Sequence, residues 1–247
     1  MMRECCDLGD IFKGDFCLKV DTSDCTGMLT GCDYDIADDV WRYRDCSFDS
    51  GKIYGIVGEF KQGGTYLSYL LGGRTDFDRV KIFCNGIPVT REQLNAVGWC
   101  LEPSGEAYGK KHIRKSIEKA LAQSGSNEYF LSVAEKFLLT EPRYDRRFKY
   151  LSGERWRAAA AYGYALGKRI FFAPYMQSEF YYQMCQCSLL KVFKNLTDCG
   201  GLVILPVGSD KLMKHIADEV LYIDREYDID ELRGFYEERF NSGEWVH

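Results

Sequence analysis

The sequence predicts an α/β fold in which a mainly parallel sheet carries helices on both faces. Short, buried-looking strands alternate with helical segments along the second half of the chain, which is typical of parallel strands joined by crossover helices. A glycine-rich loop, Gly58–Thr65, separates an apolar strand from a helix. The length of 247 residues suits one domain with an inserted lobe better than two independent domains, since single α/β domains often reach this size.

The predicted elements of the first hundred residues are short. Residues 1–50 mix polar turn residues with apolar alternation and predict short strands and turns. Gly51–Gly58 is an apolar run stopped by glycine and predicts a strand, whereas Thr65–Gly73 has helical length and ends in Gly-Gly. Over residues 80–102 we expect two short strands around a turn at Asn85-Gly86, because this dipeptide favours tight hairpins.

Helical and strand patterns alternate along the rest of the chain. Apolar residues fall on one helical face within residues 109–141, in two stripes separated by a Gly/Ser break at 124–126. An alanine-rich helix follows Glu154 and runs through Leu166. The later segments are predicted as a strand at 170–173, a helix at 180–196, a strand at 202–205, a short helix at 210–217 and a strand at 219–223.

Composition excludes several classes of function. The chain has 32 Lys plus Arg against 37 Asp plus Glu, a net charge of −5, and no long basic tract, so generic nucleic-acid binding is not expected. Its 11 cysteines form no CxxC pair and have no histidine at zinc-ligand spacing, which predicts no metal site. Because the sequence has neither a signal-peptide pattern nor a run of about 18 apolar residues, we expect a cytoplasmic protein that reaches a membrane only through a partner.

The glycine loop matches the phosphate-loop pattern G-x-x-x-x-G-K-[ST] at every fixed position but one, because Gly64 stands where the lysine belongs. In such a loop, backbone N–H groups and the helix N-terminus hold phosphates, the lysine reaches the outer phosphates, and the hydroxyl binds magnesium. Lys61 is the candidate that restores the missing charge. A strand-to-helix turn without a ligand is the alternative. The candidate nucleotide-binding residues of the loop are Gly58, Lys61, Gly63, Gly64 and Thr65.

Three further segments, together with the loop, resemble the ordered landmarks of ATP-binding-cassette (ABC) ATPases. Val97–Glu102 resembles the Q-loop strand, with Glu102 at the glutamine position. The segment Leu151-Ser152-Gly153-Glu154 resembles the LSGGQ signature and precedes a helix and a Walker-B-like strand at Ile170–Phe172. Gly201–Ile223 resembles the switch-histidine strand and the apolar run after it.

The resemblance covers about residues 40–225 and implies a P-loop NTPase-like fold of the ABC type. It implies a nucleotide-binding domain over residues 1–227, with an N-terminal antiparallel β part and a helical lobe inserted at about 103–158. Residues 228–247 are then a C-terminal helical tail. The family also stacks adenine on an aromatic residue upstream of the loop. The candidates for that position are Trp41 and Tyr43, with Tyr34 as a third, and ordinary packing of these rings is the alternative.

The departures from the family pattern lie at its catalytic positions. Phe172–Tyr175 contains no carboxylate where the family has the magnesium-binding Asp and the water-polarising Glu. The switch histidine falls on Gly208 or Ser209, and Glu154 replaces or displaces the second glycine of the signature. Since metal and base assistance supply much of the transition-state stabilisation, we expect little hydrolysis. The alternative is rescue from other positions, for which the candidates are Lys61, Glu179, Asp210 and His215.

These features predict a catalytically deficient ABC subunit of a membrane transporter. The family works as head-to-tail pairs, so this chain is expected to couple to permease subunits and to pair with an active ATPase subunit or a second copy of itself. ATP and magnesium are the implied cofactors, and the lost motifs predict weak binding of both. The alternative function is a pseudo-ATPase that serves as a scaffold or regulatory binding module outside transport. The transported substrate and its direction are not encoded in this chain.

Overall fold

The computed structural model describes residues 11–23, 28–30, 40–42, 45–58, 63–75, 80–150, 154–186 and 188–223, together with residues 237 and 241. A five-stranded parallel sheet forms the centre of the chain, in the order β11-β5-β10-β9-β8. Its strands are β5 (Ile53–Val57), β8 (Gly98–Cys100), β9 (Ile170–Phe172), β10 (Leu202–Val207) and β11 (Glu219–Tyr222). The predicted parallel sheet is therefore confirmed.

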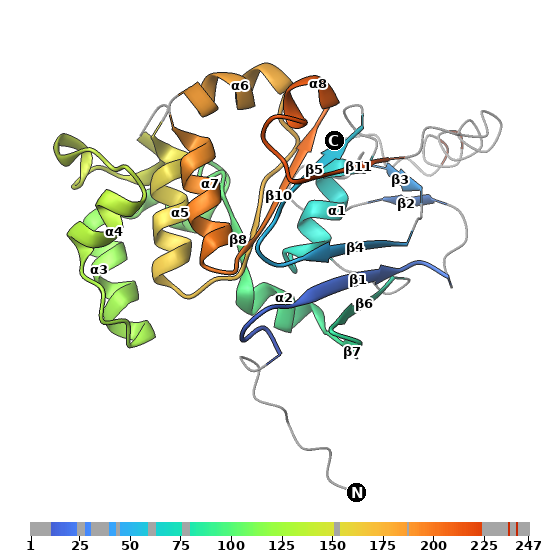
Figure 1. Cartoon of the computed structure of the whole chain (residues 1–247), viewed down its shortest axis with the longest axis horizontal. Helices are drawn as coiled ribbons and strands as arrows, with labels where there is room; N and C mark the ends of the chain where they lie inside the picture. The colour runs from blue at the N-terminus through green and yellow to red at the C-terminus, as the bar shows by residue number, and fades with distance from the viewer. Residues whose placement is uncertain are drawn as a thin grey trace, which may run out of the picture.

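A four-stranded sheet, in the order β4-β1-β6-β7, lies beside the parallel sheet (Figure 1). Its strands pair antiparallel and are β1 (Cys17–Asp21), β4 (Cys46–Asp49), β6 (Lys81–Cys84) and β7 (Ile87–Pro88). A separate antiparallel pair joins β2 (Met28–Thr30) to β3 (Val40–Arg42). The hairpin between β6 and β7 turns at Asn85 and Gly86, whose φ angles of 50° and 80° suit a two-residue turn. The predicted antiparallel part and the hairpin are thus confirmed.

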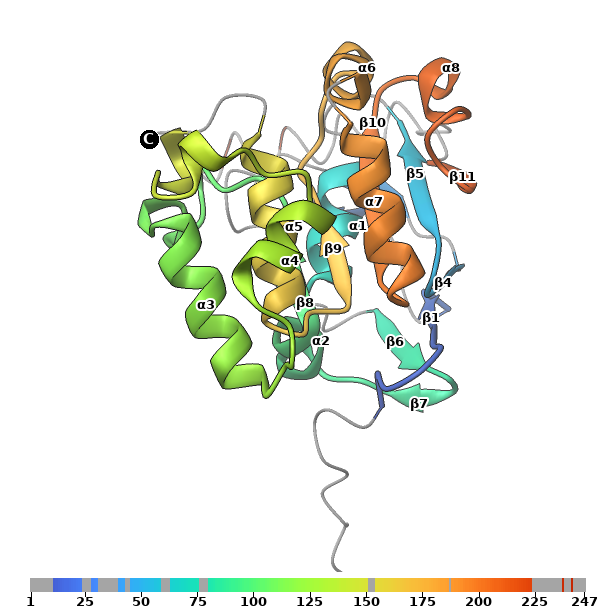
Figure 2. The same ribbon diagram turned by 60° about the vertical axis from the view of Figure 1, so that its left-hand side comes forward.

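Helices cover both faces of the parallel sheet (Figure 2). Helix α1 (Gly64–Leu71) lies between the two sheets, whereas α5 (Arg155–Ala165) and α7 (Leu189–Asp198) pack on the other face. The remaining α-helices are α2 (Arg91–Val97), α3 (Ile113–Ser124), α4 (Phe130–Lys136), α6 (Ser178–Gln186) and α8 (Asp210–Met213), and the 3-10 helices are η1 (Ala107–Lys110), η2 (Glu141–Arg143) and η3 (Phe148–Tyr150). Among the described residues, no helix combines the length and apolar character that a membrane span requires.

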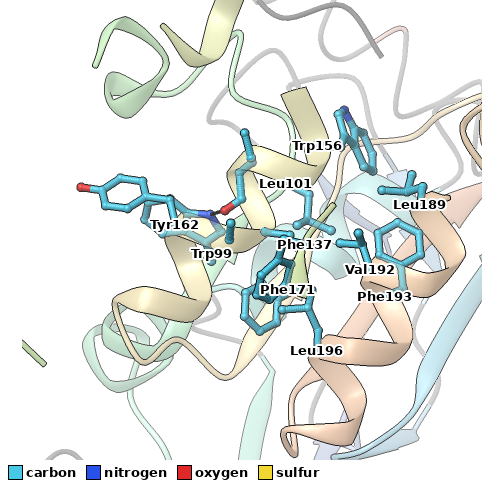
Figure 3. Close-up of a cluster of buried hydrophobic side chains, with 14 of the residues drawn as sticks. Trp99, Leu101, Phe137, Trp156, Tyr162, Phe171, Leu189, Val192, Phe193 and Leu196 are labelled. Carbon is cyan, nitrogen blue, oxygen red and sulfur yellow. Dashed lines mark hydrogen bonds between the residues drawn. The ribbon is translucent and has the colours of Figure 1, made fainter. Parts of the chain in front are cut away.

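The central strand β10 divides the core into two layers. Its side chains alternate between the faces, so Val203 and Leu205 join the cluster with α5 and α7 while Leu202 and Ile204 join the cluster with α1. The first cluster includes Phe171 and Trp99, drawn in Figure 3, and Trp99 donates its indole N–H to the Ala159 carbonyl at 2.8 Å. This layering holds the strand ends of the parallel sheet rigidly in place.

Three helical predictions need correction. The predicted helix at 180–196 is two helices, α6 and α7, because Ser188 adopts a left-handed conformation with φ of 70°. Helix α8 ends at Met213, four residues before the predicted end. Helix α2 was predicted as part of a two-strand region, although Thr90 and Gln93 form a capping box at its start. Of the predicted tail at 228–247, residues 237 and 241 are helical and the others lie outside the described residues.

Candidate functional site

The glycine loop joins β5 to α1 at the carboxyl edge of the parallel sheet, as predicted. Gly58 follows β5, and its N–H donates to the Val207 carbonyl of β10 at 3.0 Å. Gly63 has φ of 92°, a left-handed conformation that glycine adopts without strain, and α1 begins directly after it. Residues 59–62, and with them the candidate Lys61, lie outside the described residues.

Gly64, at the position of the family's lysine, is buried against the central strand. A Cβ on this residue would lie 3.2 Å from Cβ of Pro206 and 3.8 Å from Cδ1 of Ile223. A Cβ at Gly64 therefore requires the neighbouring Pro206 side chain to move by a few tenths of an ångström.

Thr65 occupies the position of the hydroxyl that binds magnesium in phosphate loops. It is 8% exposed, and its Oγ1 accepts a hydrogen bond from the backbone N–H of Tyr175 at 2.9 Å. Tyr175 lies three residues beyond β9, so the bond ties the first turn of α1 to the segment that follows the Walker-B-like strand. One acceptor site of the hydroxyl oxygen is thus occupied by the protein backbone.

Pro206 removes one hydrogen bond between β10 and the segment that follows β9. In the ladder between β9 and β10, alternate N–H groups of β10 point at β9, as at Leu202, whose N–H donates to the Arg169 carbonyl at 2.8 Å. The same alternation places position 206 opposite the Ala173 carbonyl, where proline has no N–H. Ser68 Oγ lies 2.7 Å from that carbonyl oxygen and 2.9 Å from the Thr65 carbonyl oxygen, and its single proton can be donated to either. A hydroxyl of α1 is thus placed to donate to the carbonyl that Pro206 leaves without an N–H.

The side chain of Tyr175 reaches across the strand ends to Gly208. A Cβ on Gly208 would lie 2.3 Å from the tyrosine hydroxyl oxygen, so any side chain there would displace the phenol. Gly208 is one of the two residues aligned with the switch histidine. The other, Ser209, caps α8 by accepting a hydrogen bond from the Lys211 N–H at 3.3 Å. No sequence pattern predicts a role for Tyr175. The local signal is Pro174, which predicts the end of the strand.

Asp210 is one of the candidates for rescuing catalysis. Its carboxylate contacts two neighbouring side chains. Its Oδ2 lies 2.6 Å from Lys214 Nζ and accepts a hydrogen bond from the Tyr222 hydroxyl at 2.7 Å. The bond from Lys214, followed by that from Tyr222, lowers the pKa of Asp210. A lowered pKa makes this carboxylate a poor proton acceptor.

Glu102, aligned with the Q-loop glutamine, binds the start of helix α5. One carboxylate oxygen, Oε2, accepts a hydrogen bond from Trp156 Nε1 at 2.8 Å and pairs with Arg155 at 2.9 Å. The other, Oε1, accepts from the Ser104 N–H at 3.0 Å. The Glu102 side chain is 12% exposed. It therefore links the sheet to the helix that follows the signature segment.

Glu154, the last residue of the signature-like segment, is buried within the helical lobe. It is 1% exposed and accepts hydrogen bonds from Thr140 N at 2.6 Å, Thr140 Oγ1 at 2.8 Å and Arg143 at 2.8 Å. Arg157 lies 3.7 Å from the same carboxylate. The carboxylate is thus paired with arginine side chains inside the lobe. The sequence did not predict this pairing.

The remaining candidates are only partly placed. Leu151, Ser152 and Gly153 lie outside the described residues, as do Tyr34 and Tyr43. The backbone of Trp41 pairs with Leu29 in the β2-β3 ladder, and nothing is described of its side chain.

The described residues of this site do not fit a bound magnesium ion. Ala173, Pro174 and Tyr175 offer no carboxylate after β9, and the Thr65 hydroxyl already accepts a backbone N–H. Magnesium prefers oxygen ligands in near-octahedral geometry, often from one or two carboxylates. Within the described ranges, no group of three His, Cys, Asp or Glu side chains is arranged to hold a metal.

No protein-family model and no curated protein matches the sequence. Solved structures match by fold. The chain is similar to the ATP-binding protein of a putative ABC transporter from Pyrococcus furiosus, with 14% identity and a TM-score of 0.58 over 84% of this chain and 97% of that chain. It is similar to cbiO1 of Clostridium perfringens, part of the ABC transporter complex cbiONQ, with 13% identity and a TM-score of 0.59 over 85% and 86% of the two chains.

A third similar structure is the dimeric bacterial ABC transporter cassette MJ0796, with 13% identity and a TM-score of 0.60 over 83% of this chain and 94% of that chain. The same cassette has been solved in a post-hydrolysis state bound to ADP and Pi. The chain thus has the ABC ATPase fold, one of the P-loop NTPase folds, and the expected fold class is confirmed.

Proposed function

We propose that this chain is a catalytically deficient ATP-binding-cassette subunit of a membrane transporter. The observation that carries the proposal is the bond from the Tyr175 N–H to Thr65, at the position where the family's hydroxyl binds magnesium. The structural neighbours support the transporter context, since one is part of a transporter complex and another is a dimer. In this proposal the chain lies at the cytoplasmic face of a membrane, held there by its permease partners.

Several independent losses support the deficiency. Gly64 supplies no charge for the outer phosphates, Ala173 and Pro174 supply neither a metal ligand nor a base, and Gly208 supplies no histidine. General-base assistance alone is worth roughly 10²- to 10⁴-fold in rate. A cassette that lacks all of these groups contributes to transport through binding and contact, and an active ATPase subunit supplies the turnover.

The contacts of Glu102 suggest how such a subunit transmits movement. Glu102 connects the sheet to α5 through Arg155 and Trp156, and Glu106 pairs with Arg74 at 3.0 Å across the same boundary. These bonds connect the helical lobe to the core. In the proposal, the permease docks beside this boundary, and the chain moves as one unit with its partner.

The test is a calorimetric titration of the purified chain with ATP, in magnesium and in EDTA. We expect any affinity for ATP to be the same in both buffers and to be unchanged in a Thr65→Val variant. Thr197→Val is the matched control, because Thr197 is 7% exposed and Thr65 is 8% exposed. Magnesium-dependent affinity that Thr65→Val removes and Thr197→Val keeps would contradict the proposal. Absence of binding in both the natural chain and a Gly64→Lys variant would instead favour the scaffold function.

A further inference from the structure

Helices α3 and α4 form the outer edge of the helical lobe, away from both sheets (Figures 1 and 2). An open hollow of about 860 Å³ lies between α3, the loop that follows it, the first turn of α4 and η2. The buried side chains of Leu121 and Phe130 line it, whereas Tyr129 and Leu131 line it while remaining 67% and 57% exposed. Large exposed apolar side chains gathered around one hollow mark an interaction site more often than isolated ones do.

The lining of the hollow contains more acidic than basic side chains. Of its charged lining residues, Glu128 is paired with Lys136 at 2.9 Å. Arg114 lies over the rings of Phe130 and Tyr144, at 5.1 and 5.3 Å, and 3.8 Å from a carboxylate oxygen of Asp145.

The two other glutamates of the lining, Glu118 and Glu141, are exposed. Within the part of the chain that the structure describes, neither forms an ion pair. Two exposed carboxylates therefore lie beside the apolar rim, and a partner with basic side chains complements them.

We propose that this hollow is a docking site for a protein segment that forms an amphipathic helix, with Lys or Arg beside aliphatic side chains. The hollow accepts the apolar face of such a helix, and the basic side chains pair with Glu118 and Glu141. The exposed Tyr129 and Leu131 favour a protein segment over a small molecule, because they offer large apolar side chains that a partner surface can cover. No residue between 98 and 106 lines the hollow, so the site is separate from the boundary at Glu102. The proposal does not depend on the nucleotide site.

The test is selection of a phage-displayed library of helical peptides against the full chain, followed by affinity measurements on the enriched peptides. We expect enriched peptides to carry Lys or Arg together with Leu or Ile at spacings of three and four residues. Their dissociation constants should rise at least tenfold for Tyr129→Ser and for the double variant Glu118→Lys/Glu141→Lys. Tyr150→Ser is the matched control, because Tyr150 is 62% exposed and does not line the hollow.

Circular dichroism of each variant checks that the fold is kept, which is expected because the substituted side chains are exposed. Three outcomes would overturn the proposal. These are failure to enrich any peptide, enrichment of acidic or uncharged peptides, and peptides that bind the Tyr129→Ser variant as tightly as the natural chain.

Discussion

The hydroxyl oxygen of Thr65 accepts a hydrogen bond from the backbone N–H of Tyr175, at 2.9 Å. Both residues belong to segments that bind magnesium in the ABC family, and here they bind each other. The bond also satisfies a backbone donor in a segment that has just left the sheet. The hydroxyl at this position therefore contributes a hydrogen bond between α1 and the segment after β9.

Thr65→Val tests the structural role of this hydroxyl. The substitution keeps the shape of the side chain and leaves the Tyr175 N–H without its acceptor, so we expect a loss of about 1–3 kcal/mol in the free energy of unfolding. Urea denaturation followed by circular dichroism measures the change. Thr65→Ser keeps the hydroxyl and should recover most of the stability. Equal stabilities of the valine variant and the natural chain would show that the bond is not formed.

Ser68 and Pro206 should behave as a coupled pair. Ser68→Ala removes the donor to the Ala173 carbonyl and should cost about 1–3 kcal/mol. In a Pro206→Val background the strand regains the N–H that points at this carbonyl, so the same substitution should cost at least 1 kcal/mol less. A double-mutant cycle from four denaturation curves gives the coupling energy. Additive effects would mean that the N–H of residue 206 does not replace the serine hydroxyl.

Glu102→Gln restores the residue that the Q-loop has in the family. The amide oxygen can still accept from Trp156, but the charge that pairs with Arg155 is lost. We expect destabilisation by about 1 kcal/mol, measured by urea denaturation. The control is Glu219→Gln, because Glu219 pairs with Lys52 at the surface and is 54% exposed, so its loss should cost under about 0.5 kcal/mol. If Glu102→Gln instead stabilises the chain, the ion pair between Glu102 and Arg155 does not contribute to stability.

Glu128 gives the helical lobe a predictable dependence on pH. Burial by itself would raise the pKa of Glu128, but hydrogen bonds from Tyr164 and Lys136 outweigh it, and the pKa is lowered from 4.5. The unfolded chain therefore takes up this proton at a higher pH than the folded chain does. The stabilisation is present above pH 4.5 and is lost as the pH falls through the folded-state pKa.

The corresponding experiment compares urea denaturation at pH 6 and pH 4 for the natural chain and for Glu128→Gln. The natural chain should lose more stability between these two pH values than the variant does. Identical losses in both proteins would show that Glu128 makes no net contribution to the pH dependence.

Local chemistry explains which parts of the fold could be predicted from the sequence. The strand, glycine loop and helix around Gly58–Thr65 follow from an apolar run, a left-handed glycine and an uninterrupted helical segment. The hairpin at Asn85-Gly86 follows from two residues that accept positive φ. The break between α6 and α7 could not be predicted, because Ser188 adopts a left-handed conformation that its residue type does not favour.

The residues of the candidate site could be predicted from the sequence, but most of their contacts could not. The expectation of weak catalysis rests on residues alone, namely Gly64, Ala173, Pro174 and Gly208 at the positions that resemble the family's catalytic ones, and it stays a prediction. The partners of Thr65, Glu102 and Glu154 are 110, 54 and 14 residues away along the chain for the contacts with Tyr175, Trp156 and Thr140. Such contacts depend on how β9, α5 and the lobe pack together, and no local pattern indicates them.

The most direct test of the central claim is ATP turnover by the purified chain with saturating ATP and magnesium. We predict a rate indistinguishable from the buffer blank, and the same rate for Thr65→Val, because among the described residues no carboxylate follows β9 and position 64 is glycine. Magnesium-dependent turnover that falls in the Thr65→Val variant, with Thr197→Val unaffected, would contradict the account. Such a result would show that the hydroxyl held by Tyr175 is released to serve catalysis.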